Sequence, residues 1–352
     1  GEWNALKLLN ARGEFLSAED GAKILAARAA GQFDFAPVSE LGRRIAVTDG
    51  IERHIQAILN LDLVDVEAIR ARGFAVALDA VASTGGIAIP MLLEALGVQR
   101  IEGLYCEPTG NFPHNPEPLR KHLDEICALV PETQCDLGIV VDPDVDRLVF
   151  VSENGELFGE EYTLVAVADY VLGKTKGDTV SNLSSTRALK DITEKHGGKY
   201  HAAAVGEVNV VAKMKEVNAV IGGEGNGGII VPDFHYGRDA LIGIALFLTQ
   251  LSQSSKTVKQ LRSSYPNYFI SKNKIEMDGK TNLNLVFEKL KEKYKSNPLN
   301  TIDGLRIEFD NDWVHLRSSN TEPIIRIIAE SNFETTANNI ASKLIRDIQE
   351  SL

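Results

Sequence analysis

Three aspartates at alternate positions, followed by an arginine, are the most chemically distinctive feature of this sequence. Asp142, Asp144 and Asp146 belong to the segment Asp142-Pro-Asp-Val-Asp-Arg147, which follows the apolar run Leu137-Gly-Ile-Val-Val141. Side chains two residues apart in an extended chain point to the same side, so the three carboxylates can converge where the strand bends into a loop. Carboxylate oxygens are the ligands of hard divalent cations. The segment therefore predicts a metal site at the end of a buried strand.

Two other interpretations of this segment are an EF-hand loop, which the flanking residues reject, and a solvated acidic turn. An EF-hand loop also needs acids at its first, third and fifth positions and a glutamate at its twelfth, and Glu153 stands at that place. However, Arg147 occupies the position that needs glycine, and the flanking runs are apolar and partly β-branched, unlike paired amphipathic helices. A solvated acidic turn between two strands is the other alternative to a metal site.

A second polar cluster, Arg317-Ser-Ser-Asn-Thr-Glu-Pro323, lies between two apolar runs near the C-terminal end. It places a guanidinium, three hydroxyl groups and an amide within five residues. Arginine binds phosphate in a bidentate manner, and the neighbouring side chains and backbone offer further donors, so the cluster suits a phosphate dianion. The candidate ligands are Arg317, Ser318, Ser319, Asn320 and Thr321. A polar hairpin turn is the alternative explanation, because serine, asparagine and threonine favour turns.

A glycine-rich run occupies residues 222–228, where Glu224 and Asn226 are the only polar side chains. Five glycines in seven residues are not expected in a helix or in the core of a sheet. The run lies between two apolar runs inside a domain. We therefore interpret it as a loop that contacts a ligand, in preference to a flexible linker.

Composition and charge narrow the kinds of partner. With 352 residues, 44% of them hydrophobic and 24% charged, the chain is that of an ordinary globular protein with several domains. Its 37 basic and 49 acidic residues give a net charge of −12, which disfavours nonspecific binding to nucleic acid or to an anionic membrane. The three cysteines lack paired spacing, which indicates a reducing, cytoplasmic location. The histidines form no zinc-binding sequence pattern.

Alternation of apolar, β-branched runs with amphipathic stretches from residue 54 to about 250 predicts parallel α/β units. We expect strands at 74–78, 137–141, 179–183 and 219–221, and helices at 87–96, 117–129 and 160–172. The polar stretch 252–256 is the best candidate for a linker. Beyond it, strands near 268–275, 304–309, 313–316 and 324–328 and helices near 282–294 and 334–351 predict a small α+β domain. The predicted division of the chain is 1–53, 54–150, 151–255 and 256–352.

Taken in order, four segments resemble those of the α-D-phosphohexomutases, and most of all those of the phosphoglucosamine mutases. Asn4-Ala-Leu-Lys7 is similar to the segment after the family's phosphoserine loop, 142–147 to its Mg²⁺ loop, 223–228 to its sugar-recognition loop, and 317–323 to its phosphate-holding loop. The resemblance extends over essentially the whole chain.

Two departures from the family pattern matter. The Thr/Ser-Ala-Ser-His-Asn-Pro motif that carries the reactive serine does not occur in this sequence, so we expect a fragment in which residues 1–53 are the remnant of the first domain. In many bacterial phosphomannomutases and phosphoglucomutases the sugar loop is Gly-Glu-x-Ser-Gly-His. This chain has Asn226 in place of the serine and Gly228 in place of the histidine. The hexose preference is left open by that difference.

The resemblance implies a fold of successive three-layer α/β domains with mixed sheets, plus a C-terminal α+β domain, around a central cleft. It implies an isomerase that interconverts glucosamine 6-phosphate and glucosamine 1-phosphate through a phosphoserine and a bisphosphorylated sugar, with Mg²⁺ as cofactor. The implied roles are Lys7 and Arg147 as catalytic residues, Asp142, Asp144 and Asp146 as Mg²⁺ ligands, Glu207, Glu224 and Asn226 as sugar contacts, and Arg317, Ser318, Ser319, Asn320, Thr321 and Arg326 as phosphate contacts.

Three alternatives to this function remain. In the first, the protein is a phosphomannomutase or phosphoglucomutase. In the second, the isolated chain binds Mg²⁺ and sugar phosphates without turnover, because it lacks the serine. In the third, the aspartate loop is the metal site of a metal-dependent phosphatase. In each case the expected partner is a hexose or hexosamine phosphate, with neither nucleic acid nor a membrane. Both a monomer and a homodimer are compatible with the sequence.

Overall fold

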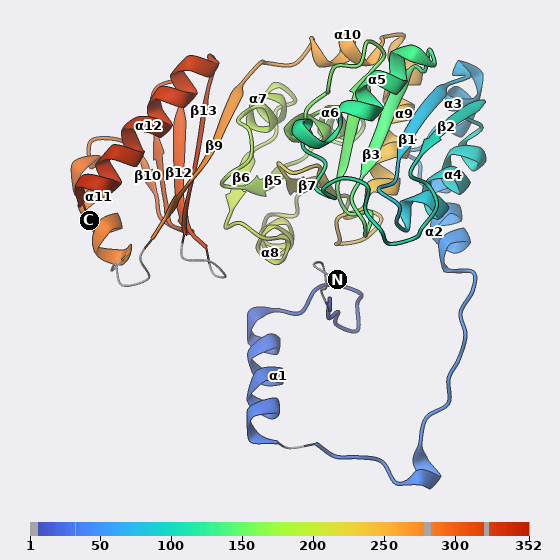
Figure 1. Ribbon diagram of the computed structural model, residues 1–352, viewed down its shortest axis with the longest axis horizontal. Coiled ribbons are helices and arrows are strands. Elements are labelled where there is room, and N and C mark those ends of the chain that lie inside the picture. Colours follow the sequence, from blue (N-terminus) through green and yellow to red (C-terminus); the bar gives the residue numbers. More distant parts are fainter. Residues whose placement is uncertain (1–5, 32, 278–282, 320–323, 352) are drawn as a thin grey trace.

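Three β-sheets with their covering helices form the body of the molecule (Figure 1). The computed structural model describes residues 6–31, 33–277, 283–319 and 324–351. Two sheets follow one another between residues 75 and 230, and the third belongs to the C-terminal part of the chain. This arrangement confirms the predicted fold class of successive α/β units followed by an α+β unit.

The first sheet has the strand order β2-β1-β3-β4. Strands β1, β2 and β3 are parallel, and β4 runs antiparallel to β3. Every residue of β3 and β4 is buried, which explains their continuous apolar sequence. The elements of this unit are α2 (Gly50–Leu59), α3 (Val66–Arg72), β1 (Ala75–Asp79), α4 (Gly85–Leu96), β2 (Arg100–Leu104), α5 (Asp124–Glu132), β3 (Leu137–Val141) and β4 (Leu148–Ser152).

The second sheet repeats the pattern with the order β6-β5-β7-β8, in which only β8 is antiparallel to its neighbour. Its elements are α6 (Glu160–Lys174), β5 (Thr179–Asn182), α7 (Ala188–Lys195), β6 (Tyr200–Ala203), α8 (Glu207–Val217), β7 (Ile221–Glu224), β8 (Gly228–Ile230) and α9 (Ala240–Ser254). Helices α6 and α9 are buried along most of their length, and one hydrophobic core joins both units. The rings of Phe150 in β4 and Phe247 in α9 stack with centroids 3.7 Å apart.

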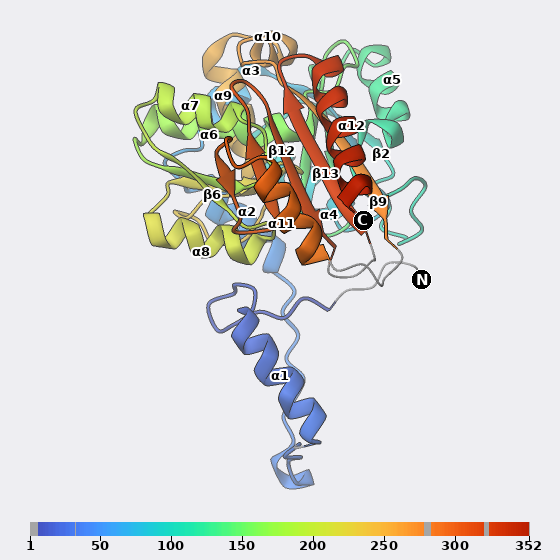
Figure 2. The same ribbon diagram turned by 90° about the vertical axis from the view of Figure 1, so that its left-hand side faces the viewer.

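The third sheet is antiparallel, with the order β10-β11-β12-β13-β9 and its own hydrophobic core. Helices α11 and α12 lie together over one of its faces (Figures 1 and 2). After α10 (Val258–Arg262), its elements are β9 (Phe269–Glu276), α11 (Leu283–Lys293), β10 (Leu299–Asn300), β11 (Leu305–Glu308), β12 (Trp313–Ser318), β13 (Ile324–Ser331) and α12 (Glu334–Ser351). The expected α+β composition of this part is therefore confirmed.

The N-terminal segment projects from the body (Figures 1 and 2). Its helix α1 (Ala18–Ala30) is capped by Ser17, whose Oγ accepts a hydrogen bond from the backbone N–H of Asp20 at 3.1 Å. All residues of α1 are partly or fully exposed. The residues before α1 return to the body, where Glu14 Oε1 accepts a hydrogen bond from Lys215 Nζ of α8 at 2.5 Å.

The interpretation of the glycine-rich run as a loop outside the sheet was wrong. Gly222 and Gly223 belong to β7 and Gly228 to β8, and all three are buried. A Cβ atom at Gly222 would lie 2.5 Å from Met214 Sδ and 2.8 Å from the carbonyl oxygen of Val180. These glycines are therefore required by close packing of the strands against their neighbours, and only residues 225–227 form the turn between β7 and β8.

Two further expectations need correction. The polar stretch 252–256 is not an independent linker, because α9 continues to Ser254 and Thr257 already caps α10. The helix expected at 117–129 begins later: a 3₁₀ turn at Arg120–His122 precedes α5. The division at residues 54, 151 and 256 stays a prediction. Across the described ranges, helices that are both long and apolar enough to cross a bilayer are absent.

Candidate functional site

The three aspartates of the metal loop, residues 142–147, converge at the carboxyl end of β3. Asp142 is buried, and its Oδ1 accepts hydrogen bonds from the backbone N–H groups of Asp146 and Arg147, both at 3.0 Å. Val145 has a φ of 60°, an uncommon conformation for a β-branched residue. Carboxylate oxygens of all three aspartates lie within 4.8 Å of one another. The predicted convergence is thus present.

The electrostatics of this group suit a bound cation. Burial, together with the charges of Asp146 and Asp144, raises the pKa of Asp142 to about 7. Burial also acts against ionisation of Asp146, but the charges of Arg238 and Lys7 lower its pKa. Asp146 Oδ1 is buried and has no hydrogen-bond partner among the described residues. A buried, unpaired carboxylate oxygen beside two further carboxylates fits a hard divalent ion such as Mg²⁺.

Lys7 reaches the metal loop from the N-terminal segment. Its ammonium group is hydrogen-bonded to Asp144 and lies 3.0 Å from Asp146 Oδ2. Partial burial works against the charge of Lys7, but the hydrogen bonds to both aspartates raise its pKa. The lysine is therefore a protonated cation next to the carboxylates of the metal loop.

Arg238, which the sequence analysis missed, connects the metal loop to two other acidic residues. Its guanidinium lies 2.7 Å from Asp146 Oδ2, 2.9 Å from Glu207 Oε2 and 2.8 Å from Glu224 Oε2. Only 11% of its side chain is exposed. The signal in the sequence was weak, since a single arginine before the N-cap residue of α9, Asp239, marks the position.

The candidate sugar contacts occupy different positions. Glu224, at the end of β7, is buried and also accepts hydrogen bonds from Asn182 Nδ2 at 2.9 Å and from the N–H of Gly206 at 3.2 Å. Glu207 is the first residue of α8 and faces Arg238; burial raises its pKa and the charge of Arg238 opposes the rise. Asn226 Oδ1 accepts a hydrogen bond from the N–H of Gly228, 3.2 Å away.

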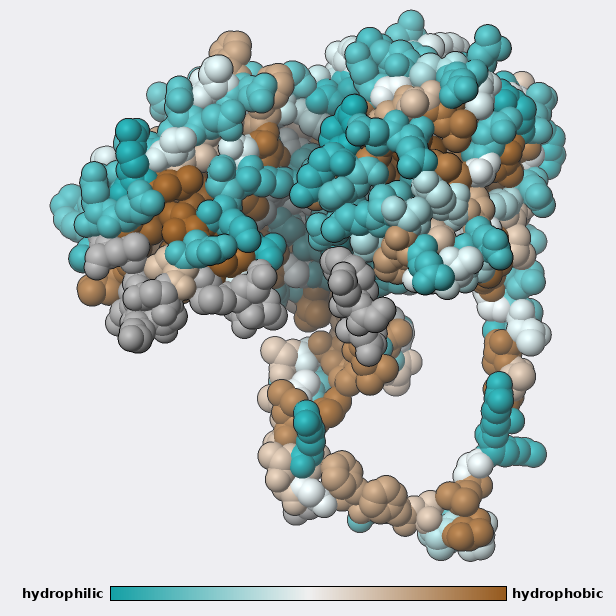
Figure 3. Space-filling model, in the orientation of Figure 1, coloured by the Kyte–Doolittle hydropathy of each residue, from teal (hydrophilic) through white to brown (hydrophobic). Residues whose placement is uncertain are grey.

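A cavity of about 280 Å³ lies between the metal loop, the second sheet and the third sheet. Figure 3 shows a hollow between the C-terminal unit and the rest of the molecule on the face drawn. The charged and amide residues of the lining are Arg147, Lys272, Arg317, Arg326, Glu117, Glu161, Glu224, Asn182 and Asn226. Residues from three predicted units therefore share one cavity, as expected for a central cleft.

The balance of charge in this cavity favours an anion. Four cationic side chains line it against three glutamates, of which Glu224 is paired with the guanidinium of Arg238. Burial raises the pKa of Glu161 to about 8, although Lys272 opposes the rise, so this carboxyl group is largely protonated at neutral pH. A cavity with excess positive charge stabilises a phosphate dianion.

The described residues of the phosphate loop, 317–319, lie at the end of β12, and Arg317 lines the cavity. Arg317 in β12 is paired with Arg326 in β13, and the N–H of Ser319 donates to the carbonyl oxygen of Ile324 at 3.0 Å. Arg317 Nε lies 3.0 Å from Asp303 Oδ2, which orients the guanidinium. Ser318 is the last residue of β12. The predicted ligands Asn320 and Thr321 lie outside the described residues.

The sequence and structure of this chain are similar to those of known proteins over most of its length. Family models match residues 52–155 (phosphoglucomutase/phosphomannomutase, α/β/α domain II), 159–268 (α/β/α domain III of the same family) and 274–346 (its C-terminal domain). A phosphoglucomutase/phosphomannomutase of Thermococcus kodakarensis is 36% identical over 100% of this chain and 76% of its own length. A probable phosphoglucosamine mutase of Methanopyrus kandleri is 29% identical, over 98% of this chain and 75% of its own length. The crystal structure of a Burkholderia thailandensis phosphoglucomutase/phosphomannomutase family protein superimposes with a TM-score of 0.75 at 26% identity, covering 86% of this chain and 64% of that chain.

Proposed function

The chain belongs to the phosphoglucomutase/phosphomannomutase family of phosphosugar mutases, the α-D-phosphohexomutases, and we propose that it acts on glucosamine phosphates. The proposed reaction interconverts glucosamine 6-phosphate and glucosamine 1-phosphate in the cytoplasm. In this reaction a phosphoserine, whose family motif does not occur in these 352 residues, donates its phosphoryl group to the free sugar hydroxyl, and the bisphosphorylated sugar then returns its other phosphoryl group to the serine.

The observation that carries this proposal is the junction between the metal loop and the cationic cavity at Arg147. Arg147 follows the three aspartates directly, and its side chain lines the cavity, 3.4 Å from Glu117 Oε1. A phosphorylated sugar in the cavity would therefore lie between the metal loop, next to Arg147, and the guanidinium groups of Arg317 and Arg326. Phosphoryl transfer depends on such positioning and charge compensation.

The residues of the chain divide the work as follows in this proposal. Asp142, Asp144 and Asp146 would hold Mg²⁺, which when bound stabilises negative charge on phosphoryl oxygens as a Lewis acid. Arg147 adds a second positive charge at the transferring group. Lys7, kept protonated by its carboxylate partners, donates a proton or a charge-assisted hydrogen bond near that group.

The other phosphate of the sugar would bind at the part of the cavity wall formed by β12 and β13. Arg317, Arg326, Ser318 and Ser319 lie in or beside the wall there, and the family resemblance adds Asn320 and Thr321 to this group. The sugar ring would then contact Glu224 and Asn226, with Glu207 acting only through Arg238.

The preference for an amino sugar rests on the resemblance to the phosphoglucosamine mutases and on an acidic residue of the cavity wall. A Cβ atom at Gly228 would lie 2.3 Å from Arg238 Cδ, so the histidine of many bacterial relatives is incompatible with Arg238 in its present position. The partly exposed carboxylate of Glu117 in the cavity wall would attract a protonated amino group on the sugar.

The reaction is tested with glucosamine, glucose and mannose 6-phosphates in a mutase assay of the natural full-length protein. We expect the highest kcat/KM with glucosamine 6-phosphate. Ready turnover of glucose or mannose phosphates without turnover of glucosamine 6-phosphate would contradict the substrate. Release of inorganic phosphate without isomerisation would instead indicate a phosphatase.

Binding is tested separately on the 352-residue chain by calorimetry, because the motif of the reactive serine does not occur in this sequence. Arg317→Ala should weaken glucosamine 6-phosphate binding by about 10- to 150-fold, since a hydrogen bond to a charged group contributes about 1.5–3 kcal/mol. Arg120→Ala removes an exposed cation on a 3₁₀ turn and serves as the control. Equal affinity in both variants would reject the phosphate-holding role.

A further inference from the structure

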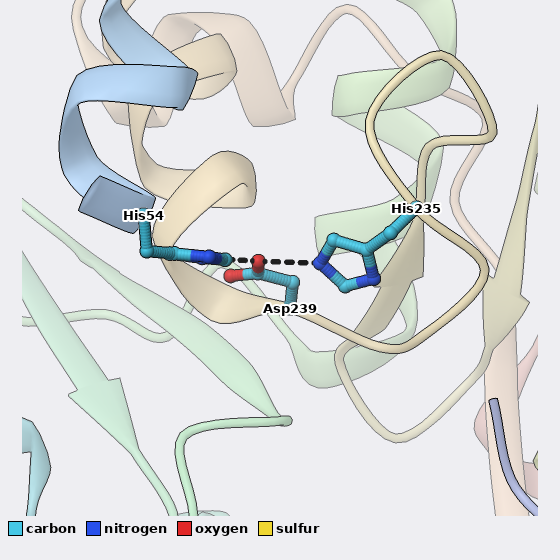
Figure 4. A group of neighbouring side chains, drawn as sticks. All are labelled: His54, His235 and Asp239. Atoms are coloured by element: carbon cyan, nitrogen blue, oxygen red, sulfur yellow. Dashed lines mark hydrogen bonds and ion pairs between the residues drawn. The ribbon is translucent and has the colours of Figure 1, made fainter. Parts of the chain in front are cut away.

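Two histidines and an aspartate converge on one point outside the cavity. His54 comes from α2, His235 from the segment between β8 and α9, and Asp239 from the start of α9 (Figure 4). The Nε2 atoms of His54 and His235 lie 2.8 Å and 2.9 Å from the same oxygen, Asp239 Oδ2. The ligand atoms of the three residues lie within 4.8 Å of one another.

The fold fixes the aspartate in this arrangement. Asp239 Oδ1 caps α9 by accepting hydrogen bonds from the N–H groups of Leu241 at 2.8 Å and Ile242 at 3.3 Å. This leaves Oδ2 to face the imidazoles. Only 7% of the aspartate side chain is exposed, whereas 35% of the His54 side chain and 40% of the His235 side chain are exposed. The Asp239 carboxylate is therefore fixed and buried, whereas an ion can reach the two imidazoles from solvent.

The imidazole rings are also held from the side. The ring of Phe234 packs against His54 with a centroid distance of 5.0 Å and against His235 with one of 4.8 Å. This apolar contact restricts rotation of both rings while their Nε2 atoms point toward the aspartate. Orientation of ligand side chains by their surroundings is a usual property of protein metal sites.

We propose that His54, His235 and Asp239 bind a divalent transition-metal ion, of which Zn²⁺ is the representative. Two imidazole nitrogens and one carboxylate oxygen are the donor set of three-ligand zinc sites, in which water completes the coordination. Neighbouring ligand atoms around such an ion are roughly 3 Å apart, so small side-chain movements suffice to enclose it. Nitrogen ligands select borderline transition metals, whereas the all-oxygen group of the metal loop selects Mg²⁺.

The position of the site implies that the ion acts as a clamp. Binding would join α2 to the segment that carries Arg238, and Arg238 contacts Asp146 at 2.7 Å. In the same segment the N–H of Ala240 donates to the carbonyl oxygen of Val145 at 3.1 Å. The ion would thus restrain the metal loop through the contacts of Arg238 and Ala240, without contacting a substrate in the cavity.

The test is Zn²⁺ titration of the 352-residue chain by competition with a chromophoric chelator, in millimolar Mg²⁺. We expect one Zn²⁺ per chain for the wild type, retained in Asp144→Asn because that variant changes only the metal loop. In His54→Gln and His235→Gln the affinity should fall at least about tenfold. Co²⁺ should give visible d–d absorption with the wild type that both histidine variants lose.

His201→Gln is the matched control, because His201 also pairs with an aspartate, Asp178, at 2.8 Å but outside the cluster. It should bind Zn²⁺ like the wild type. The wild type, but not His54→Gln or His235→Gln, should show a rise in Tm with Zn²⁺. Absence of a Zn²⁺ equivalent, its retention in both histidine variants, or its loss in Asp144→Asn would overturn the proposal. These readouts involve no sugar phosphate, so they stand apart from the mutase assay.

Discussion

Glu161 gives the most quantitative prediction, because its carboxyl group is buried in the cavity wall. Burial raises its pKa from an ordinary value of 4.5 to about 8, against the opposing charge of Lys272. Glu161 Oε2 accepts a hydrogen bond from the N–H of Thr186 at 3.0 Å. Glu161→Gln keeps an oxygen acceptor for that N–H group and removes the ionisation, so the variant isolates the effect of the proton.

The sign of the effect follows from proton binding in the two states. A folded pKa above the unfolded pKa means that the folded chain holds a proton that the unfolded chain has released. The resulting stability is fully present below the unfolded pKa, near 4.5, and is lost as the pH rises through about 8. Between pH 5.5 and 7.5, each unit of rise in pH removes about 1.4 kcal/mol of the stability that the protonated Glu161 contributes to the folded state.

The measurement is urea denaturation of the wild type and of Glu161→Gln at several pH values from 5.5 to 7.5. The variant should lack this contribution, so the difference in unfolding free energy should shift in its favour by about 2–3 kcal/mol over the range. Glu160→Gln, one residue earlier on α6 and partly exposed, should follow the wild type. A pH-independent difference between Glu161→Gln and the wild type would refute the assignment of a neutral Glu161 at neutral pH.

Two further predictions concern packing and buried charge. Arg238→Met should lower the free energy of unfolding by about 3–5 kcal/mol in EDTA, because three carboxylates lose their counterion. The control Arg120→Met, at an exposed ion pair, should lower it by less than about 1 kcal/mol. Equal losses of the two variants in chemical denaturation would contradict the buried network. Gly222→Ala should cost about 1–3 kcal/mol because the new methyl group would meet Met214 and Val180; a thermal-melting comparison with Gly21→Ala, where the methyl group meets open space, checks it, and an unchanged Tm for Gly222→Ala would contradict the packing argument.

The strands and the metal loop were predictable because the relevant signals are local. The apolar run 137–141 is buried on both faces in β3, and the alternating aspartates lie just beyond its end. Likewise, the polar cluster at Arg317 sits between two apolar runs that became β12 and β13. In each case neighbouring residues alone carry the pattern.

The features that the sequence analysis missed depend on residues far apart in the chain. Arg238 meets partners 14, 31 and 92 positions away, and His54 meets Asp239 across 185 positions. The glycine-rich run was misjudged for the same reason, because the atoms that forbid a side chain at Gly222 belong to Met214 and Val180. Conformational freedom explains glycine in a turn, but only the packed fold shows that close contact requires it in a strand.

The central claim is that three aspartates hold a divalent cation beside a cationic cavity. The direct measurement is calorimetric titration of the 352-residue chain with Mg²⁺, for the wild type, Asp144→Asn and the surface control Asp124→Asn. We expect one Mg²⁺ per chain for the wild type and Asp124→Asn, and an affinity at least about tenfold lower for Asp144→Asn, because a hard cation depends on carboxylate charge. Equal Mg²⁺ affinity in all three proteins would contradict the account.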